Sequence, residues 1–184
     1  MLEHAPLLGC KRRVENMKIV FVVQKKRALV EVPGARDDEV VVDDDGQGLF
    51  TTGLRHGDAL HVSRFHPDHP HPMVFGIHEN EGSPWDATTP ALAAYDARTG
   101  QTLWRTGDGK DAIRGLAADI DPRFAGAEMW SDFHQLRTCF GEIVGRAPRS
   151  ANFAVWWDGD LLRELLDRTT ISKWNWEQGQ LEPL

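Results

Sequence analysis

The chain has 184 residues, of which 41% are hydrophobic, enough to build the core of one ordinary globular domain and too many for a disordered tail. Its formal net charge of -7 argues against nucleic acid and against an anionic membrane surface as partners, because both would repel an acidic protein. Two cysteines are too few for a disulfide framework, and no apolar stretch reaches the roughly 18 residues of a membrane-spanning helix.

The N-terminal part of the chain predicts a short β-hairpin. Lys18 to Val23 and Ala28 to Val32 are β-branched runs joined by a basic turn. Residues 1–13 lack the order of basic, apolar and small-residue regions that marks a signal peptide, so no export signal is expected there. Acidic clusters then bracket another strand at Val40 to Val42.

From Gly53 onward the pattern is typical of an all-β protein, because short apolar runs alternate with turns rich in Gly, Pro and Asp. Strands are expected at Leu60 to Ser63, Met73 to Ile77, Leu92 to Tyr95, Thr102 to Trp104, Glu128 to Trp130, Phe153 to Trp157 and Ile171 to Trp174. Tryptophans in or beside these runs are expected to pack between strands, and sugar stacking by Trp85 or Trp176 is the alternative.

Two acidic loops each have two aspartates at alternate positions and are closed by a later glutamate. The loops supply Asp119, Asp121 and Glu128, and Asp158, Asp160 and Glu164. Such a turn suits calcium, which takes six to eight oxygen ligands at roughly 2.3–2.6 Å. A third loop, Arg64 to Met73, fits the same frame but has Arg, His, His and Met at the matching positions, so its cation site is expected to be lost.

The spacing of these loops along the chain is comparable to the roughly 40 to 50 residues of a propeller blade, so the sequence predicts a repeat. One segment leaves an alternative open. Leu161, Leu162, Leu165 and Leu166 have helical spacing, and Asp160 is suited to cap a helix there.

Histidines form a second candidate metal site. His56, Asp58 and His61 lie close in sequence, and Glu79 follows further along. Imidazole ligands on their own favour zinc, copper or nickel, and ordinary surface histidines are an equal alternative for this cluster. His66, His69 and His71 occupy a proline-rich turn and are interpreted as scattered surface residues.

Four segments together resemble the calcium-dependent β-propeller family of bacterial rhamnogalacturonan lyases. They are His56 to His61, Tyr95 to Gly100, Arg114 to Arg123 and Asn152 to Asp167, within a resemblance that runs from about Asp37 to Trp176. The resemblance implies an unmatched segment at 1–35 and a partial β-propeller at 36–184, with about three to four blades of an eight-bladed family fold. It also implies β-elimination in the rhamnose and galacturonate backbone of pectin, outside the cell.

The resemblance also implies roles for single residues. Calcium near the cleft would be bound at positions matching His56, Asp58 and Glu79, and structural calcium at Asp119, Asp121, Glu128, Asp158, Asp160 and Glu164. Arg114 matches an arginine that engages the galacturonate carboxylate, a task suited to a planar guanidinium fork. The family's lysine in an Asn-Gly-Thr-Lys segment and a later tyrosine are expected beyond the position of Trp176, where this sequence has neither, so no catalytic residue is identified.

Two functions from different classes therefore stay open. One is a rhamnogalacturonan lyase, with little or no activity expected from these residues alone and with internal or terminal cleavage undecided. The other is a non-catalytic calcium-binding β fragment or a carbohydrate-binding remnant. In either case three or four blades would leave open strand edges, which predicts self-association.

Overall fold

The computed structural model describes residues 21–24, 38–42, 47–55, 57–78, 90–106, 112–132 and 134–184. In this part of the chain every regular element is a β-strand, and no helix is long and apolar enough to cross a membrane. The prediction of an all-β protein is thereby confirmed.

Within the described ranges, fifteen strands form four antiparallel sheets, each built from strands in chain order. Sheet I has β1 (Phe21–Gln24), β2 (Asp38–Val42) and β3 (Gly48–Arg55). Sheet II has β4 (Ala59–Ser63), β5 (Met73–Ile77), β6 (Leu92–Asp96) and β7 (Thr102–Thr106). Sheet III has β8 (Gly115–Ala118), β9 (Glu128–Ser131), β10 (Leu136–Thr138) and β11 (Ile143–Gly145). Sheet IV has β12 (Phe153–Val155), β13 (Glu164–Asp167), β14 (Thr170–Asn175) and β15 (Gln180–Pro183).

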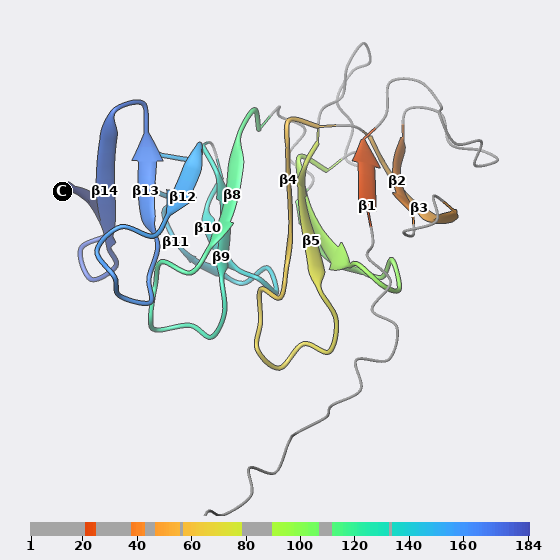
Figure 1. The fold of residues 1–184 in the computed structure, drawn as a ribbon, viewed down its shortest axis with the longest axis horizontal. Helices are drawn as coiled ribbons and strands as arrows, with labels where there is room; N and C mark the ends of the chain where they lie inside the picture. Colours follow the sequence, from red (N-terminus) through yellow and green to blue (C-terminus); the bar gives the residue numbers. More distant parts are fainter. Residues whose placement is uncertain are drawn as a thin grey trace, which may run out of the picture.

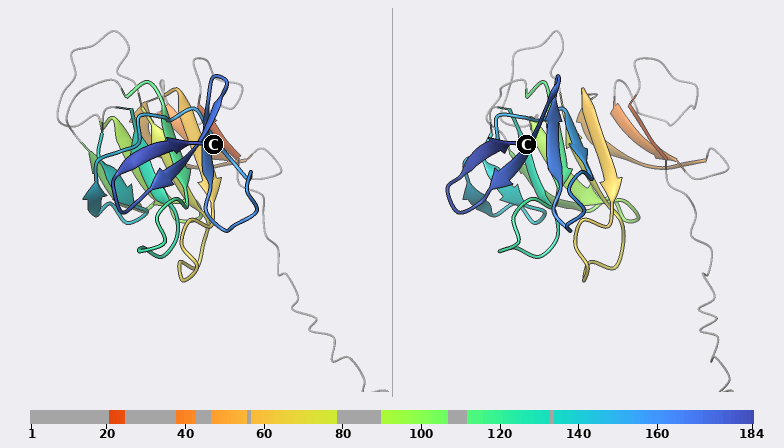
Figure 2. Two further views of the ribbon diagram at one scale, coloured as in Figure 1. Left: turned by 90° about the vertical axis from the view of Figure 1, so that its left-hand side faces the viewer. Right: turned by 60° about the vertical axis from the view of Figure 1, so that its left-hand side comes forward.

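The four sheets stand side by side in chain order, from sheet I at the right of Figure 1 to sheet IV at the left, and the turned views of Figure 2 show the same succession. The first strands of sheets II, III and IV are neighbours, since β8 contacts both β4 and β12. These three strands begin at the upper end of the sheets in Figure 1 and run to the lower end.

Each strand expected between residues 60 and 174 is present, and the structure adds β3, β8, β10, β11, β13 and β15. Near the N-terminus, β1 pairs with β2, whereas the expected hairpin partner at 28–32 lies outside the described residues. The helical alternative near Leu165 is not formed. That segment is β13, which pairs with β12 on one side and β14 on the other.

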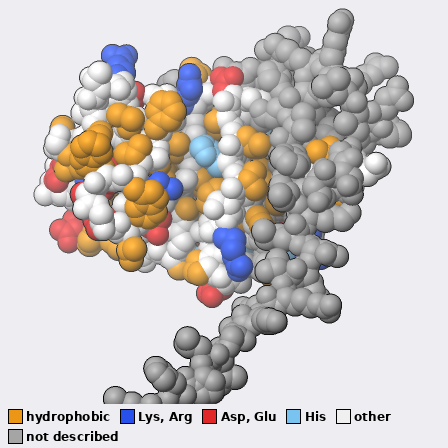
Figure 3. Space-filling view, viewed as in Figure 1, with side chains coloured by type: hydrophobic (Ala, Val, Ile, Leu, Met, Phe, Trp, Pro, Cys, Tyr) orange, Lys and Arg blue, Asp and Glu red, His pale blue; other side chains and the backbone are white. Residues whose placement is uncertain are grey.

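The tryptophans divide into buried and exposed ones. Trp130 and Trp174 are buried as expected. Trp156 and Trp157 are 59% and 64% exposed, so the expectation that they pack between strands is wrong, because they follow the short edge strand β12 into a surface loop. Figure 3 shows hydrophobic side chains gathered on the surface over sheet IV.

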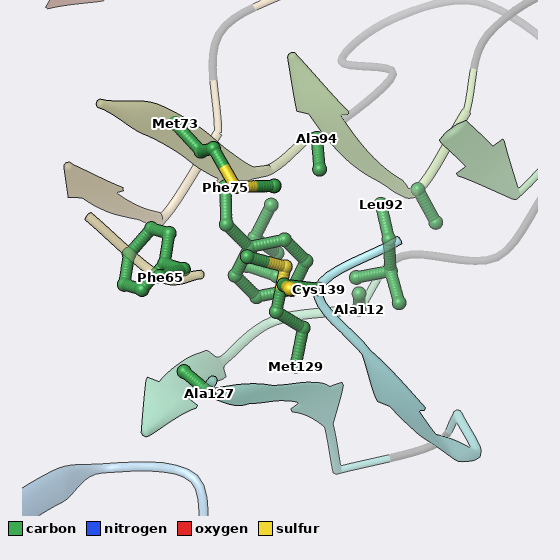
Figure 4. Packing of buried hydrophobic residues seen from close by; sticks show 11 residues of the cluster. Phe65, Met73, Phe75, Leu92, Ala94, Ala112, Ala127, Met129 and Cys139 are labelled. Atoms are coloured by element: carbon green, nitrogen blue, oxygen red, sulfur yellow. The ribbon is translucent and has the colours of Figure 1, made fainter. Parts of the chain in front are cut away.

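A hydrophobic core fills each space between successive sheets. Figure 4 shows the cluster shared by sheets II and III, in which Phe75 and Leu92 pack with Met129 and Cys139. Leu116 and Trp130 of sheet III pack with Leu165 and Trp174 of sheet IV in a second cluster.

Strand β5 explains why the sheets stack. Met73, Phe75 and Ile77 point into the core shared with sheet III, while Val74 joins Val41 in the core shared with sheet I. Successive side chains of a strand point to opposite faces, so a strand that is apolar at every position is buried on both sides.

Candidate functional site

The site residues expected from the sequence lie at opposite ends of the sheets. Asp58 and Arg114 directly precede β4 and β8, at the upper end in Figure 1. The acidic loops follow β8 and β12 and lie at the lower end. The two groups therefore belong to two separate sites.

Arg114 is an exposed side chain at the first position before β8. The next residue, Gly115, is held from the side by His61 of β4, whose Nε2–H donates to the Gly115 carbonyl oxygen at 2.8 Å. Burial lowers the pKa of His61, and the hydrogen bond to Gly115 opposes that effect. Through this hydrogen bond His61 is a strut between two sheets, and its role as a metal ligand stays a prediction.

Gly115 is required at this point by close approach of its neighbours. A Cβ there would lie 2.2 Å from Ile77 Cδ1 and 2.9 Å from the Trp130 carbonyl oxygen. The backbone directly after Arg114 is therefore packed tightly against core residues Ile77 and Trp130.

A strained turn precedes Arg114. The Arg114 N–H donates to the Ala112 carbonyl oxygen at 2.5 Å, and Ile113 between them has a φ of 53°. A positive φ is rare for a β-branched residue, and such conformations persist only where their surroundings hold them. The turn leads directly into β8, and Arg114 is the last residue before that strand.

Asp132 is a polar neighbour that the sequence analysis did not single out. The β8–β9 register pairs Gly115 with Ser131, so Arg114 and Asp132 occupy the next position. Burial raises the pKa of Asp132, the charge of Asp167 adds to that effect, and the charge of Arg114 opposes it. No local motif marks Asp132; only the strand register finds it.

The structure describes only one of the three residues predicted to bind calcium at the upper end. Asp58 is exposed at the upper end, whereas His56 and Glu79 lie outside the described residues. Their role as ligands stays a prediction.

At the lower end, the three related loops occupy equivalent places in their sheets. Met73, Glu128 and Glu164 are the first residues of β5, β9 and β13, the second strand of each sheet, and all three are fully buried. Sheet II thus has an apolar side chain where sheets III and IV each have a carboxylate.

The loop of sheet IV gathers its three carboxylates. Oxygens of Asp158, Asp160 and Glu164 lie within 4.8 Å of one another, the one such group of three or more metal-ligating side chains among the described residues. Glu164 Oε2 accepts the Trp157 N–H at 2.8 Å, while Asp158 and Asp160 accept backbone N–H groups within the loop.

A lysine on the next strand closes this cluster. Lys173 Nζ forms ion pairs with Asp158 and Asp160 and lies 3.5 Å from Glu164 Oε1. Its hydrogen bond is the main reason that the pKa of Asp158 is lowered. Sequence reading missed Lys173 because β13, the strand opposite it, had not been predicted.

The loop of sheet III arranges the same residue types differently. Glu128 Oε2 accepts the N–H groups of Ile120 and Asp121, each at 2.9 Å. Asp121 forms an ion pair with Arg123, whose Nε and Nη2 donate to the two carboxylate oxygens of Asp121 at 2.9 and 2.6 Å. Asp119, Asp121 and Glu128 are consequently not gathered as closely as the triad of sheet IV.

Electrostatics in the sheet III loop favour an added cation. Burial raises the pKa of Glu128 to about 8, backbone hydrogen bonds oppose this, and the charges of Asp119 and Asp121 add to it. Burial and the charge of Asp121 also raise the pKa of Asp119. A bound cation would relieve this crowding of negative charge.

The residues present fit a hard divalent cation at both loops. Glu128 Oε1 and Glu164 Oε1 are buried oxygens with no hydrogen-bond partner, and each belongs to a glutamate whose other oxygen is already bonded. Buried polar atoms are normally satisfied. A bound cation at each loop would give the glutamate oxygen there a partner, and calcium prefers oxygen ligands of this kind.

Hydrogen bonds link the three lower loops into a row. Ala127 N–H donates to the Phe65 carbonyl oxygen at 2.7 Å, and Arg163 N–H donates to the Asp119 carbonyl oxygen at 2.8 Å. Both donors directly precede a buried glutamate, so each acidic loop rests on the loop before it in the chain.

The loop of sheet II also pairs an acid with a base. His71 Nδ1 bonds Asp96 Oδ2 at 2.7 Å, and His69 Nε2 lies 3.8 Å from the same oxygen. His66 packs on Phe140 of sheet III, with ring centroids 4.9 Å apart. These histidines have specific partners and are not merely scattered over the surface.

Comparison with known families gives one match that covers most of the chain. Residues 30–184 match the model of "Rhamnogalacturonan lyase family 11, C-terminal domain".

Two relatives in Bacillus subtilis (strain 168) are similar in sequence. The chain is 43% identical over 158 residues to rhamnogalacturonan endolyase YesW, which covers 83% of this chain and 24% of that protein. It is 42% identical over 180 residues to rhamnogalacturonan exolyase YesX, covering 85% of this chain and 28% of that protein.

Solved structures agree with the sequence matches. The crystal structure of rhamnogalacturonan lyase YesW aligns with a TM-score of 0.72 at 38% identity, and Bacillus licheniformis rhamnogalacturonan lyase PL11 aligns with a TM-score of 0.72 at 42% identity. Each alignment covers 90% of this chain and 27% of the other, so the chain spans about a quarter of the length of its relatives.

Proposed function

Because the chain belongs to rhamnogalacturonan lyase family 11, we propose that it supplies part of a lyase that cleaves the rhamnose and galacturonate backbone of pectin by β-elimination. The single observation that carries the proposal is the match of residues 30–184 to the family model. Arg114 directly precedes β8 at the same end of the sheets as Asp58, and this placement supports the proposal.

We propose that Arg114 binds the carboxylate of a galacturonate unit. It is exposed, and its backbone is fixed by the His61 strut and by the packing of Gly115. A guanidinium pairs two carboxylate oxygens at once, which orients the sugar as well as attracting it. β-Elimination removes the proton next to that carboxylate, so a positive charge there stabilises the charge that develops as the proton leaves.

We propose calcium as the resident cation, held near Arg114 by His56, Asp58 and Glu79 and at the lower end by the two acidic loops. Bound calcium would add positive charge beside the uronate carboxylate at the upper end and tie the loops together at the lower end. The buried, unpartnered oxygens of Glu128 and Glu164 support the lower sites.

We propose that sheets II, III and IV are consecutive blades of a β-propeller and that sheet I starts the blade before them. Their common strand order, the adjacency of β4, β8 and β12, and the core between each pair of sheets support this arrangement. An outer sheet of such an arc offers a free face and strand edges, which is the basis for proposing self-association.

The lyase proposal is tested by incubating the chain with rhamnogalacturonan and calcium while ultraviolet absorbance of the unsaturated uronide is followed. Product that forms with calcium and not with a chelator supports it. No product at high protein concentration rejects catalysis by this chain.

A second candidate, calcium and carbohydrate binding without turnover, is favoured by one observation, the gathered triad of Asp158, Asp160 and Glu164. It predicts a melting temperature that rises with calcium, and binding to rhamnogalacturonan without product, because a ligand bound only by the folded state stabilises it. A melting temperature indifferent to calcium and chelator rejects this candidate.

A further inference from the structure

Lys173 occupies the position in the sheet IV loop where a cation would bind. Its ammonium group pairs with Asp158 and Asp160 and lies 3.5 Å from Glu164 Oε1, so it contacts every member of the triad. Three carboxylates around one ammonium group leave an excess of negative charge, and the buried Glu164 Oε1 still lacks a hydrogen bond.

The strand register explains why this lysine is there. The β13–β14 pair matches Leu165 with Ser172, so Glu164 and Lys173 are opposite at the next position. In sheet III the residue opposite Glu128 is Thr138, and in sheet II the residue opposite Met73 is Asp96. Among these three equivalent positions only sheet IV carries a base.

We propose that Lys173 is a built-in counter-ion, which holds the sheet IV loop together when no divalent cation is bound and is displaced when calcium takes the same oxygens. An ammonium group has donors only and cannot serve as a calcium ligand, so the two cations compete for the three carboxylates. This inference rests on the lower calcium site under "Proposed function", not on the lyase reaction.

The environment of Lys173 permits the exchange. The lysine side chain is 27% exposed, and Asp158 and Asp160 are exposed too, so the ammonium group can move into water without crossing the core. Glu164 stays in place because Trp157 N–H holds its Oε2 and because it is fully buried. The loop therefore keeps one fixed ligand and exchanges the cation in front of it.

The sheet III loop offers a contrast within the same molecule. Arg123 bonds both oxygens of a single aspartate, and its guanidinium lies over Trp176 at 5.2 Å from the ring centroid. That arginine is packed as well as paired, and it does not reach the buried Oε1 of Glu128, which keeps no hydrogen-bond partner. Lys173, in contrast, is bound by charge to the whole triad.

The test compares the full chain with two variants of the lysine, Lys173→Met and Lys173→Gln. The control is Arg105→Met, which removes one positive charge from an exposed position of β7 in another sheet. Calcium affinity is measured by calorimetry, and terbium luminescence sensitised by the nearby tryptophans serves as a second probe. Asp160→Asn identifies the component of binding that belongs to this loop.

Removing Lys173 should tighten calcium binding at the Asp160-dependent site by roughly tenfold or more, because a like charge no longer competes for the oxygens. It should also lower the melting temperature in chelator more than in excess calcium, whereas Arg105→Met changes neither quantity. Unchanged affinity, equal destabilisation with and without calcium, or no calcium binding by the chain and both Lys173 variants would each overturn the proposal. Loss of lyase product leaves this binding test unaffected, so the two proposals fail separately.

Discussion

Arg114 and Asp132 lie opposite each other one position beyond the last pair of the β8–β9 register, Gly115 and Ser131. The positive charge of Arg114 opposes the rise in the pKa of Asp132 that burial and Asp167 cause. The arginine proposed to bind substrate therefore has an exposed carboxylate of its own chain within electrostatic reach, and we expect this carboxylate to compete with that of the substrate.

Replacing Arg114 tests its proposed contact with galacturonate. Arg114→Ala should lower kcat/KM by on the order of 100-fold to 1,000-fold, as expected when a donor to a developing charge is lost. Arg114→Lys should recover only part of this, because an ammonium group keeps the charge but not the fork. The assay is uronide absorbance with rhamnogalacturonan, and Arg105→Ala serves as the control at an exposed arginine of β7. Equal rates for Arg114→Ala and the unaltered chain would refute the assignment.

Replacing Asp132 should have the opposite effect on binding. Asp132→Asn removes a carboxylate that competes for Arg114, so galacturonate oligomers should bind about 1.4-fold to 5-fold more tightly, a typical range for one exposed charge pair. Calorimetry with a galacturonate-containing oligomer measures the change. Weaker binding would mean that Asp132 orients Arg114 instead of competing for it.

Calcium should stabilise the chain through the sheet IV loop. At about 100 times the dissociation constant, a ligand bound only by the folded state adds about 2.7 kcal/mol to stability. Glu164→Gln keeps an acceptor for Trp157 N–H but loses the charge, so the calcium-induced rise in melting temperature should shrink. Asp167→Asn, which changes the same charge at the other end of β13, should retain the rise. A rise that survives Glu164→Gln unchanged would place the ion elsewhere.

Asp96 should make the fold sensitive to acid. Burial alone would raise its pKa, but hydrogen bonds from His71 and from the N–H groups of Thr99 and Arg98 outweigh burial and lower it. A carboxylate whose pKa is lower in the folded state contributes stability above its unfolded pKa of about 4, and this contribution is lost as pH falls through the folded pKa.

Asp96→Asn should therefore cost roughly 1–3 kcal/mol at neutral pH, the range for hydrogen bonds to a charged group, and its stability should depend less on pH below about 4. Denaturant unfolding at a series of pH values measures both effects. Asp68→Asn, an exposed aspartate in the neighbouring loop, is the matched control. Asp68→Asn should lose stability in acid as the unaltered chain does. The prediction fails if Asp96→Asn does the same.

Gly115→Ala should destabilise the fold by roughly 1–3 kcal/mol through overpacking, because the new methyl group meets Ile77 Cδ1 at 2.2 Å. Ile77→Val removes that carbon, so the double variant should lose less stability than the sum of the two single changes. Thermal unfolding of the four proteins measures the coupling. Strict additivity would show that the contacts left in place dominate, namely those with Ile77 Cγ1 at 2.7 Å and with the Trp130 carbonyl oxygen at 2.9 Å.

The sequence predicted the strands whose apolar side chains are continuous, and the reason is visible in β5. Met73 to Ile77 is buried on both faces, so its pattern reflects the packing directly. β8 holds one large apolar residue, Leu116, among glycine and alanines, and β15 is a polar edge strand, so neither carries a recognisable apolar run. Their strand conformation follows from pairing with neighbours that a local pattern cannot reveal.

The acidic loops could be predicted because their carboxylates are close in sequence and their aspartates share one spacing. Their basic partners could not be predicted in the same way. Lys173 reaches Asp158 from the next strand, and Asp132 meets Arg114 only through the β8–β9 register. Spacing along one loop reveals ligands, whereas counter-charges come from tertiary pairing.

The buried methionine at the start of β5 has a consequence for how the molecule comes apart. Met73 fills by apolar contact the place that Glu128 and Glu164 occupy with charge, so its loop does not depend on dissolved ions. Chelation should therefore loosen β9 and β13 before sheet II, with β4–β7 the last part to lose protection from hydrogen exchange.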